Sequence, residues 1–227
     1  MPLITTEFGG GKGMNSTKRR LLEIFRQTSY KFSDEPVFHL ASGKHSRYYV
    51  DCKQALSDPE ARLLIGNLIF QLVKDEPLDS VGGLELGAYP IATSVSDAIF
   101  LQAHKTVRAF VIRKAPKSHG VGDLVAGHIK QGDETLIVDD VVTSGTSTIK
   151  AIDCAREAGL RVQRVIVLVD REEDNGRQNI EAKGVRFDAL FTLSELRELN
   201  NDCCEKNAGT YRERPVREQS GRAVIAL

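Results

Sequence analysis

Short apolar runs alternate with stretches of helical periodicity along most of this chain. Each apolar run is rich in Val, Ile and Leu and is bounded by Gly, Pro or charged residues, which is the pattern of a buried strand. The predicted strands are residues 80–84, 107–112, 135–138, 162–169 and 187–193. Apolar residues spaced three and four apart predict helices between them. The predicted helices are residues 15–27, 57–72, 90–102, 147–158 and 179–183. This alternation is typical of an α/β fold, in which helices cover both faces of a parallel sheet.

The chain ahead of the first of these strands shows a different pattern. Two β-rich segments, Phe38–Leu40 and Ser46–Asp51, flank the turn signal Ser42-Gly43 and predict an antiparallel hairpin. Within the second segment, Tyr48 and Val50 are expected to face inward. A small β element is therefore predicted to precede the main sheet.

The two ends of the chain differ in composition from its middle. Residues 1–14 contain four glycines and little that can be buried, which predicts a flexible leader. Residues 201–227 carry charges of both signs and the vicinal pair Cys203-Cys204, which predicts a loosely ordered tail. We therefore expect one folded domain over residues 15–200.

Composition narrows the classes of protein that fit. The chain has 227 residues, of which 41% are hydrophobic, so it is long enough to bury a full core. Its 31 basic residues balance its 31 acidic ones, and no net charge attracts nucleic acid or an anionic membrane. No window approaches the ~18 apolar residues of a membrane span, and no signal or transit peptide is expected. The four cysteines lack metal-ligand spacing and indicate reduced thiols. A soluble, cytoplasmic protein is predicted.

The most informative stretch runs from Thr135 to Ser147. An apolar run is expected to carry the adjacent carboxylates of Asp139 and Asp140 to a strand end, just before a hydroxyl-rich, glycine-containing turn and a helix. Carboxylates accept hydrogen bonds from ribose hydroxyls, and the N–H groups of such a turn and helix N-terminus bind phosphate. The order of these features predicts a ribose-phosphate site.

The acidic pair fits two other interpretations. An ATPase strand also ends in acids, but it needs the phosphate loop G-x-x-x-x-G-K-[ST]. Gly11-Lys12 and Gly43-Lys44 are followed by Gly and His, so neither fits that loop. A solvated turn without a ligand is the second alternative, since acids are common in turns.

A compact basic segment runs from Arg113 to Gly120. Arg113, Lys114 and Lys117 lie within five residues, followed by His119 and by further glycines. An ordinary charged surface loop would show the same charges. In a protein of zero net charge, however, the cluster indicates a mobile flap that binds a strongly anionic group such as a magnesium-bound pyrophosphate. His119 could supply charge or a proton to a leaving group near neutral pH.

The Tyr48-Tyr49 pair and Arg171 carry less information by themselves. The tyrosine pair fits an ordinary strand, and Arg171 fits a surface cation. Ligands of open parallel sheets, however, sit beyond the carboxyl ends of the strands. Arg171, Asp139 and the turn at residues 83–89 are all expected there, which favours Arg171 as a carboxylate-binding residue.

Four motifs stand in the order found in orotate phosphoribosyltransferases, and over residues 15–200 the chain resembles this family. They are the Ser-Gly-x-x-Ser-x-Tyr-Tyr segment from Ser42, the Gly-Leu-Glu-Leu-Gly-Ala turn from Gly83, the basic segment from Arg113 and the acidic motif. The resemblance implies the type I phosphoribosyltransferase fold, with a small N-terminal hood and a mobile flap. It also implies Mg²⁺-dependent transfer of phosphoribosyl from 5-phosphoribosyl 1-pyrophosphate to orotate in de novo pyrimidine synthesis.

The resemblance also implies roles for the acidic motif. Asp139 and Asp140 would hold the ribose hydroxyls, and residues 141–147 the 5′-phosphate. Mg²⁺ would be held mainly by substrate oxygens and water, with Asp139 and Asp140 as further ligands. Thr143 and Arg171 would contact orotate.

The flap has implied roles in two subunits. Lys114 would bind pyrophosphate in its own subunit, whereas Arg113, Lys117 and His119 would reach the partner's site, so a homodimer with shared active sites is expected. The implied catalytic residues are Lys117, His119, Asp139 and Asp140. The implied substrate-binding residues are Tyr48, Tyr49, Arg113, Lys114, Lys117, His119, Asp139, Asp140, Val141, Val142, Thr143, Ser144, Gly145, Thr146, Ser147 and Arg171.

Two positions depart from the family pattern. Many relatives have Lys where this chain has Ala41 and in the turn near Gly87. Two other functions remain as alternatives: a regulator that senses phosphoribosyl pyrophosphate without turnover, and a purine-specific phosphoribosyltransferase. The neutral composition and the lack of a helix-turn-helix signal count against the regulator.

Overall fold

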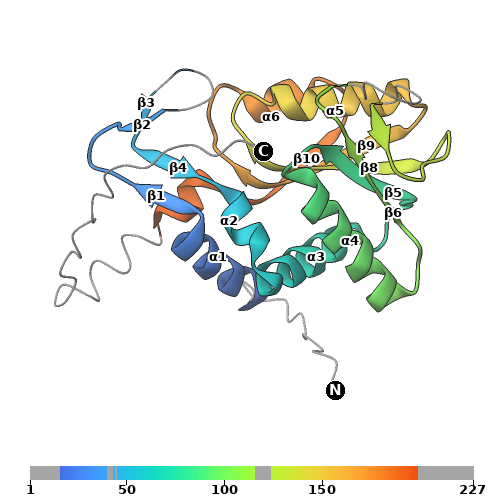
Figure 1. Ribbon diagram of the computed structural model, residues 1–227, viewed down its shortest axis with the longest axis horizontal. Helices are drawn as coiled ribbons and strands as arrows, with labels where there is room; N and C mark the ends of the chain where they lie inside the picture. The colour runs from blue at the N-terminus through green and yellow to red at the C-terminus, as the bar shows by residue number, and fades with distance from the viewer. Residues whose placement is uncertain (1–15, 40–42, 44, 116–123, 199–227) are drawn as a thin grey trace, which may run out of the picture.

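The computed structural model describes residues 16–39, 43, 45–115 and 124–198. Its centre is a six-stranded sheet in the order β10-β9-β8-β5-β6-β7 (Figure 1). These strands are β5 (Ser80–Leu84), β6 (Arg108–Ile112), β7 (Val125–Ala126), β8 (Glu134–Val142), β9 (Arg161–Asp170) and β10 (Arg186–Thr192). All neighbours pair in parallel except β7, which runs antiparallel to β6. The predicted α/β fold with a parallel sheet is confirmed.

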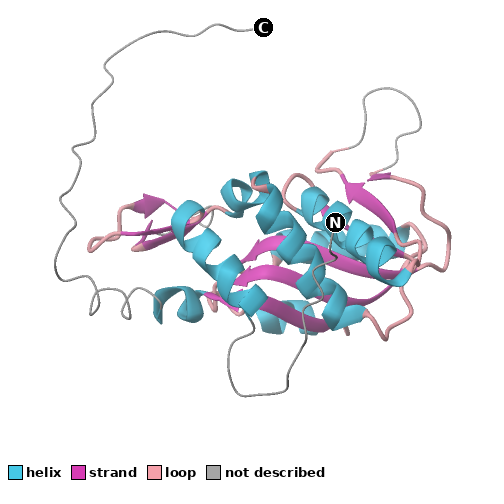
Figure 2. Ribbon diagram, turned by 90° about the horizontal axis from the view of Figure 1, so that it is seen from below, coloured by secondary structure: helices cyan, strands magenta, loops and turns pink. Residues whose placement is uncertain are grey.

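Helices cover both faces of this sheet (Figures 1 and 2). The helices are α1 (Ser16–Thr28), α2 (Cys52–Ser57), α3 (Pro59–Val73), α4 (Ala88–Ala103), α5 (Thr146–Glu157) and α6 (Gly176–Glu181). One buried cluster joins α1–α4 to the sheet, and a second joins α5 and α6 to the other face. Alternate residues of β8 serve the two clusters: Leu136 and Val138 belong to the first and Ile137 to the second. The uninterrupted apolar runs of the sequence reflect this burial on both sides.

The strand that carries the acidic pair is longer than predicted. The sequence predicted a strand of residues 135–138 that ends at the acids, but β8 continues through Asp139 and Asp140 to Val142. Its partner β9 is one residue longer, and the register pairs Val142 with Asp170. Continued pairing with β9 keeps the acids within the strand, so the turn begins only after Val142.

A small hood of two separate two-stranded sheets precedes α2. Its strands are β1 (Tyr30–Phe32), β2 (Phe38–His39), β3 (His45–Ser46) and β4 (Tyr48–Val50). The predicted hairpin is right for β2 and β3, where Phe38 pairs with Ser46. It is wrong for β4, which pairs with β1 instead and stacks Tyr48 on Phe32 with ring centroids 5.3 Å apart. Val50 is buried and Tyr48 half-buried, as the inward orientation required.

Helix α3 is capped as its sequence indicates but is not buried all round. The Asp58 side chain accepts the N–H groups of Glu60 and Ala61, and Pro59 occupies the first turn. One face packs on α4, α1 and α2, but Leu63 and Leu72 are exposed.

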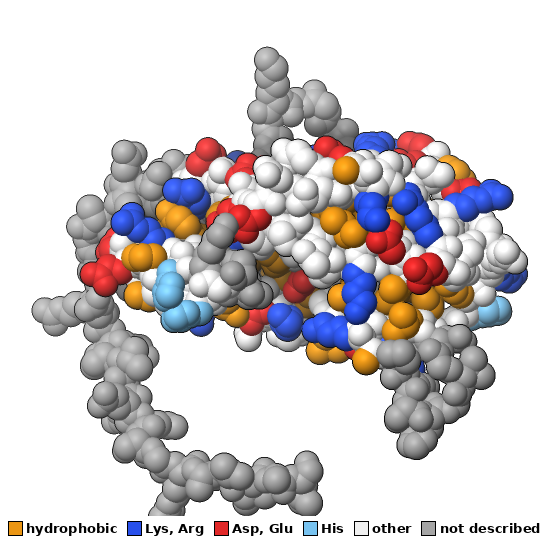
Figure 3. Space-filling model, turned by 90° about the horizontal axis from the view of Figure 1, so that it is seen from above, with side chains coloured by type: hydrophobic (Ala, Val, Ile, Leu, Met, Phe, Trp, Pro, Cys, Tyr) orange, Lys and Arg blue, Asp and Glu red, His pale blue; other side chains and the backbone are white. Residues whose placement is uncertain are grey.

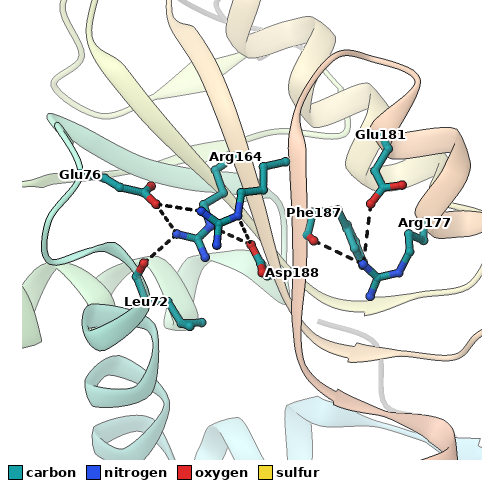
Figure 4. A network of polar contacts seen from close by, with 8 residues as sticks. Leu72, Glu76, Arg164, Arg177, Glu181, Phe187 and Asp188 are labelled. Atoms are coloured by element: carbon teal, nitrogen blue, oxygen red, sulfur yellow. Dashed lines mark hydrogen bonds and ion pairs between the residues drawn. The ribbon is translucent and has the colours of Figure 1, made fainter.

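Arg164 on β9 joins three elements at the amino-terminal edge of the sheet (Figure 4). Its buried guanidinium donates to the Leu72 carbonyl at 2.7 Å, to Glu76 at 2.5 Å and to Asp188 of β10 at 2.8 Å. Arg186 contacts the same two carboxylates from the surface. The end of α3 is thereby fixed to β9 and β10, far from the carboxyl ends of the strands.

The surface carries both signs of charge. Figure 3 shows basic and acidic side chains interspersed over the face seen there, in agreement with the zero net charge. No helix in the described part of the chain is long and apolar enough to cross a membrane. The leader at residues 1–14, the tail at 201–227 and residues 116–123 of the expected flap lie outside the described residues.

Candidate active site

The carboxyl ends of β5, β8 and β9 meet at one edge of the sheet. The turn after β5, the acidic pair on β8 and Arg171 after β9 all lie there. Backbone hydrogen bonds fix two of these connections: Arg171 donates its N–H to Val142 at 2.9 Å, and Glu85 donates to Ile112 at 2.8 Å. Parallel sheets bind their ligands at this edge.

Asp139 is buried and its carboxylate is already hydrogen-bonded. It is 5% exposed and accepts hydrogen bonds from the hydroxyls of Thr148 at 2.7 Å and Ser147 at 3.0 Å, and from the Asp140 N–H at 3.0 Å. Burial and the charge of Asp140 raise the pKa of Asp139 to about 7, although these hydrogen bonds favour the ionised form. Asp139 therefore links β8 to the first turn of α5 by hydrogen bonds.

Asp140 is the more open member of the pair. Its side chain is 19% exposed and lies 4.0 Å from the ammonium group of Lys53. A Cβ atom added at Gly87 would lie 2.5 Å from its carboxyl carbon, so a side chain at this position would displace the Asp140 carboxylate. The buried thiol of Cys52 lies 3.7 Å from the Asp140 carbonyl, and its pKa is raised by burial and by the charge of Asp140. The Asp140 carboxylate is thus held between the turn after β5 and helix α2.

The turn between β8 and α5 presents polar groups around a helix N-terminus. Gly145 precedes α5 with φ of 81°, a conformation that favours glycine, and no side chain caps the helix there. The Ser144 and Thr146 hydroxyls are 2.9 Å apart, and Asn179 donates to the Ser144 carbonyl at 2.9 Å. The N–H groups of an uncapped first turn attract anions, so this turn is suited to a phosphate. Val142 is buried in the core instead, and its carbonyl is taken by Arg171.

A cavity of about 440 Å³ opens between the hood and the ends of β9 and β10. Arg171 is buried in its wall and donates to both carboxylate oxygens of Glu173, at 3.0 and 3.1 Å, and to the Ser46 hydroxyl at 3.5 Å. The guanidinium of Arg197 lies 4.4 Å over the Tyr48 ring. The lining residues are Pro36, His45, Ser46, Arg47, Tyr48, Arg171, Glu172, Glu173, Leu193, Ser194 and Arg197. The cavity thus lies beside the acidic pair rather than over it.

The start of the basic segment is hydrogen-bonded to residues at the carboxyl edge of the sheet. The Lys114 N–H donates to the Glu85 carboxylate at 2.7 Å, and its carbonyl accepts the Lys150 ammonium at 3.0 Å. The Arg113 N–H donates to Leu124 at 2.9 Å. The chain therefore enters the basic segment beside the turn after β5. The predicted catalytic residues Lys117 and His119 lie outside the described residues.

Comparison with known proteins agrees with this geometry. The phosphoribosyl transferase domain family matches residues 53–191. A curated orotate phosphoribosyltransferase of Aquifex aeolicus is 45% identical over 179 residues, which are 79% of this chain and 97% of that protein. This chain belongs to the orotate phosphoribosyltransferase family.

Solved structures of orotate phosphoribosyltransferases share the fold. The Mycobacterium tuberculosis enzyme in complex with Fe(III) dicitrate is 34% identical, with a TM-score of 0.69 over 79% of this chain and 98% of that chain. The same enzyme in complex with 5-phospho-alpha-D-ribosyl 1-diphosphate is 30% identical, with a TM-score of 0.64 over 81% of this chain and 93% of that chain. The type I phosphoribosyltransferase fold of this chain is thereby confirmed.

The orotate phosphoribosyltransferase fold brings together most of the predicted site residues that the structure describes. Asp139, Asp140, the turn at 143–147, Lys114 and Arg171 lie along one edge of the sheet. The two tyrosines separate. Their rings stack on different partners, Tyr48 on Tyr30 and Phe32 and Tyr49 on Phe38, and only Tyr48 lines the cavity.

Three further residues at this edge were not singled out in the sequence: Lys53, Glu173 and Arg197. Glu85 was quoted only as part of the turn motif, and its contact with Lys114 was not predicted. Lys53 belongs to α2, which has six residues and is too short for an apolar periodicity to predict it. Glu173 and Arg197 reach the cavity through the tertiary fold, so no local pattern marks them.

Proposed function

We propose that this protein is an orotate phosphoribosyltransferase. It transfers the phosphoribosyl group of 5-phosphoribosyl 1-pyrophosphate to orotate and releases pyrophosphate, giving orotidine 5′-phosphate for UMP synthesis. The observation that carries this proposal is the open carboxylate of Asp140 immediately ahead of the uncapped N-terminus of α5. Family membership supports the choice of reaction, because the curated relatives carry this activity in their names.

The donor would bind across the acidic pair and the turn. Asp140 accepts hydrogen bonds from the ribose hydroxyls. Asp139 supports it by linking strand β8 to helix α5 through hydrogen bonds. The 5′-phosphate meets the N–H groups and hydroxyls of residues 143–147. A complex of the Mycobacterium tuberculosis enzyme with the same compound supports the choice of donor.

Orotate would occupy the cavity beside the donor. The ligand is a small planar anion, and the cavity is lined by Tyr48 together with Arg171 and Arg197. The carboxylate of orotate would bind a guanidinium group, because the planar guanidinium of Arg can donate two parallel hydrogen bonds to a carboxylate. Arg171 is expected to release the Glu173 carboxylate and to bind the orotate carboxylate in its place.

Magnesium would be bound mainly through the donor. No group of three or more His, Cys, Asp or Glu side chains in the described ranges could hold a metal ion, and the Asp139 oxygens are already engaged. Asp140 is the carboxylate that remains open to share an ion. This donor set fits Mg²⁺, which keeps several waters and binds through one or two carboxylates and substrate phosphates. The ion would neutralise charge on the pyrophosphate.

The chemical step needs no covalent enzyme intermediate. A ring nitrogen of orotate forms a bond to the anomeric carbon of ribose while the bond from that carbon to pyrophosphate breaks, and the proton of that nitrogen passes to solvent. Positive charge develops on the ribose and negative charge on the pyrophosphate. Lys114, Lys117 and His119 would stabilise the leaving group, an electrostatic effect that is worth ~3 kcal/mol per donor in other enzymes.

We also propose that the protein is a homodimer. Six large apolar side chains of α3, α4 and the turn between β5 and α4 are exposed: Leu63, Leu72, Leu86, Tyr89, Phe100 and Leu101. Burial between two copies would remove this surface from water. Arg113, Lys117 and His119 of each subunit would then serve the neighbouring site. The cytoplasmic location and the lack of a nucleic-acid partner stay predictions from composition.

The absorbance of orotate provides the test. Adding 5-phosphoribosyl 1-pyrophosphate and Mg²⁺ to the purified protein with orotate should lower the orotate absorbance, whereas Asp140→Asn should slow this loss strongly. Adenine and hypoxanthine, assayed side by side, should give no product. Turnover of a purine instead would establish the purine-specific alternative. Donor binding without turnover of any base would establish the regulator and overturn the proposal.

A further inference from the structure

Lys53 is the cation that reaches the acidic pair within the described part of the chain. Its ammonium group lies 3.2 Å from Asp51 and 4.0 Å from Asp140. Burial disfavours its charge, but the two carboxylates outweigh burial, so the pKa of Lys53 is raised. The side chain is 59% exposed and therefore remains accessible to a ligand at Asp140.

Helix α2 places Lys53 firmly. Its N-cap residue Asp51 accepts the Lys53 N–H at 3.2 Å, and the Asp51 N–H donates to the Ser29 carbonyl at 2.8 Å. Cys52 is completely buried beneath the Asp140 carbonyl. The base of the Lys53 side chain is consequently fixed against β8, and only its flexible end has to be ordered over the acidic pair.

The turn on the opposite side of Asp140 contains no basic side chain. The turn there consists of Glu85, Leu86 and Gly87. Gly87 approaches the Asp140 carboxylate so closely that a Cβ there would displace the carboxylate. The Glu85 carboxylate accepts the Lys114 N–H and adds a further negative charge to this edge. A donor with several phosphate charges would meet repulsion here unless a cation offsets it.

We propose that Lys53 is a positioning residue for 5-phosphoribosyl 1-pyrophosphate. It holds the Asp140 carboxylate in the orientation that binds the ribose hydroxyls and offsets the negative charge that the donor meets at this edge. The proposal rests on the proposed function, and it adds to it a residue of α2 and a reason for the exposed charge beside the acidic pair. If Lys53 had only a structural role and paired with its own N-cap residue Asp51, its replacement would leave the affinity for the donor unchanged.

Kinetics of three variants separate these roles. Lys53→Met should raise KM for the donor about tenfold, equal to about 1.4 kcal/mol, while KM for orotate changes less than about twofold. Lys53→Arg, which keeps the charge, should restore most of the donor affinity. Lys74→Met removes an exposed lysine at the end of α3 and should behave as wild type.

Calorimetry with the donor alone makes the test independent of turnover. Lys53→Met should bind 5-phosphoribosyl 1-pyrophosphate about tenfold more weakly than wild type and melt at the same temperature. Equal donor affinity in Lys53→Met and Lys74→Met would overturn the proposal while leaving the proposed function intact. Equal loss of affinity for the donor and orotate would do the same, because it indicates a structural effect. A wild-type protein that neither binds the donor nor consumes orotate would overturn both.

Discussion

Asp139 and Asp140 are neighbours in sequence but have opposite surroundings. Asp139 faces the hydroxyls of α5 in the protein interior, whereas Asp140 faces Lys53 and the exposed edge of the sheet. Alternation along β8 explains the difference, since successive side chains of a strand point to opposite faces. One carboxylate therefore stabilises the site and the other is open to a ligand.

The raised pKa of Asp139 should make stability depend on pH. The folded pKa is about 7 and the ordinary value is 3.8, so between these values the folded state binds the extra proton. The contribution of this group to stability is therefore complete below pH 3.8 and is lost as the pH rises through 7. Urea unfolding at several pH values should show this loss in wild type, at no more than about 1.4 kcal/mol per pH unit. Asp139→Asn, which cannot ionise, should lack it, and parallel profiles for the two proteins would contradict the assignment.

A methyl group at Gly87 should disturb donor binding through Asp140. The backbone at Gly87 has φ of −64° and accepts alanine, so Gly87→Ala acts only through the 2.5 Å approach to the Asp140 carboxyl group. KM for the donor should rise about tenfold or more, with an unchanged melting temperature. In an Asp140→Asn background the same change should have a much smaller effect. An equal effect in both backgrounds would show that Gly87 acts by another route.

The two edges of the sheet carry residues of different function. The carboxyl edge holds the turn after β5, the acidic pair and Arg171. The amino edge holds the Arg164 network, which joins the end of α3 to β9 and β10. Residues that stabilise the sheet and residues that contact a ligand are therefore separated along the strands, so they can be altered independently.

The Arg164 network should prove important for stability and unimportant for turnover. Arg164→Met leaves Glu76 and Asp188 without their buried partner and should lower the free energy of unfolding by about 2–3 kcal/mol. Arg186→Met is the matched control, because Arg186 contacts the same two carboxylates but is 61% exposed, against 4% for Arg164. It should cost less than about 1 kcal/mol. Denaturant unfolding measures both, and equal losses would contradict the role of burial.

Element length decides which parts of the fold the sequence could predict. The long apolar runs of β8 and β9 are buried on both faces, so their composition alone identifies them. The strands β1 and β7 have three and two residues and exist only because partners pair with them. Helix α2 has six residues and packs on β8 through Cys52. Lys53 was missed with it, whereas the acidic pair was found because it belongs to a long strand.

At the scale of the whole molecule, the proposed site is complete only in a dimer. Residues 113 and 114 enter the basic segment beside the subunit's own acidic pair, and the segment is proposed to act in the neighbouring site. Two chains with defects in different parts of the site should therefore complement each other. Each homodimer would lack one essential group in both sites, but a heterodimer would keep one intact site.

Mixing Lys117→Ala with Asp140→Asn tests this arrangement. Random assortment places half of the chains in heterodimers with one intact site of two, so activity should recover to about one quarter of wild type. Sedimentation of the same samples measures the dimer. The mixture of Lys117→Ala with wild type serves as the reference and should keep half of the wild-type activity whether or not subunits exchange. No recovery in a mixture that contains heterodimers would show that each chain completes its own site.

The bidentate pair of Arg171 and Glu173 has a consequence for selectivity. Glu173 presents to Arg171 the same functional group that orotate carries, so the protein contains an internal competitor for its proposed ligand. Only the fraction of molecules in which Glu173 has released Arg171 can bind, and the apparent affinity is lowered by that fraction. An uncharged base such as uracil cannot compensate the released guanidinium. Glu173→Gln should therefore tighten orotate binding while uracil binding changes little, which competition binding measures. Glu173 lowers the affinity for orotate, and it keeps the Arg171 guanidinium paired while the cavity holds no ligand.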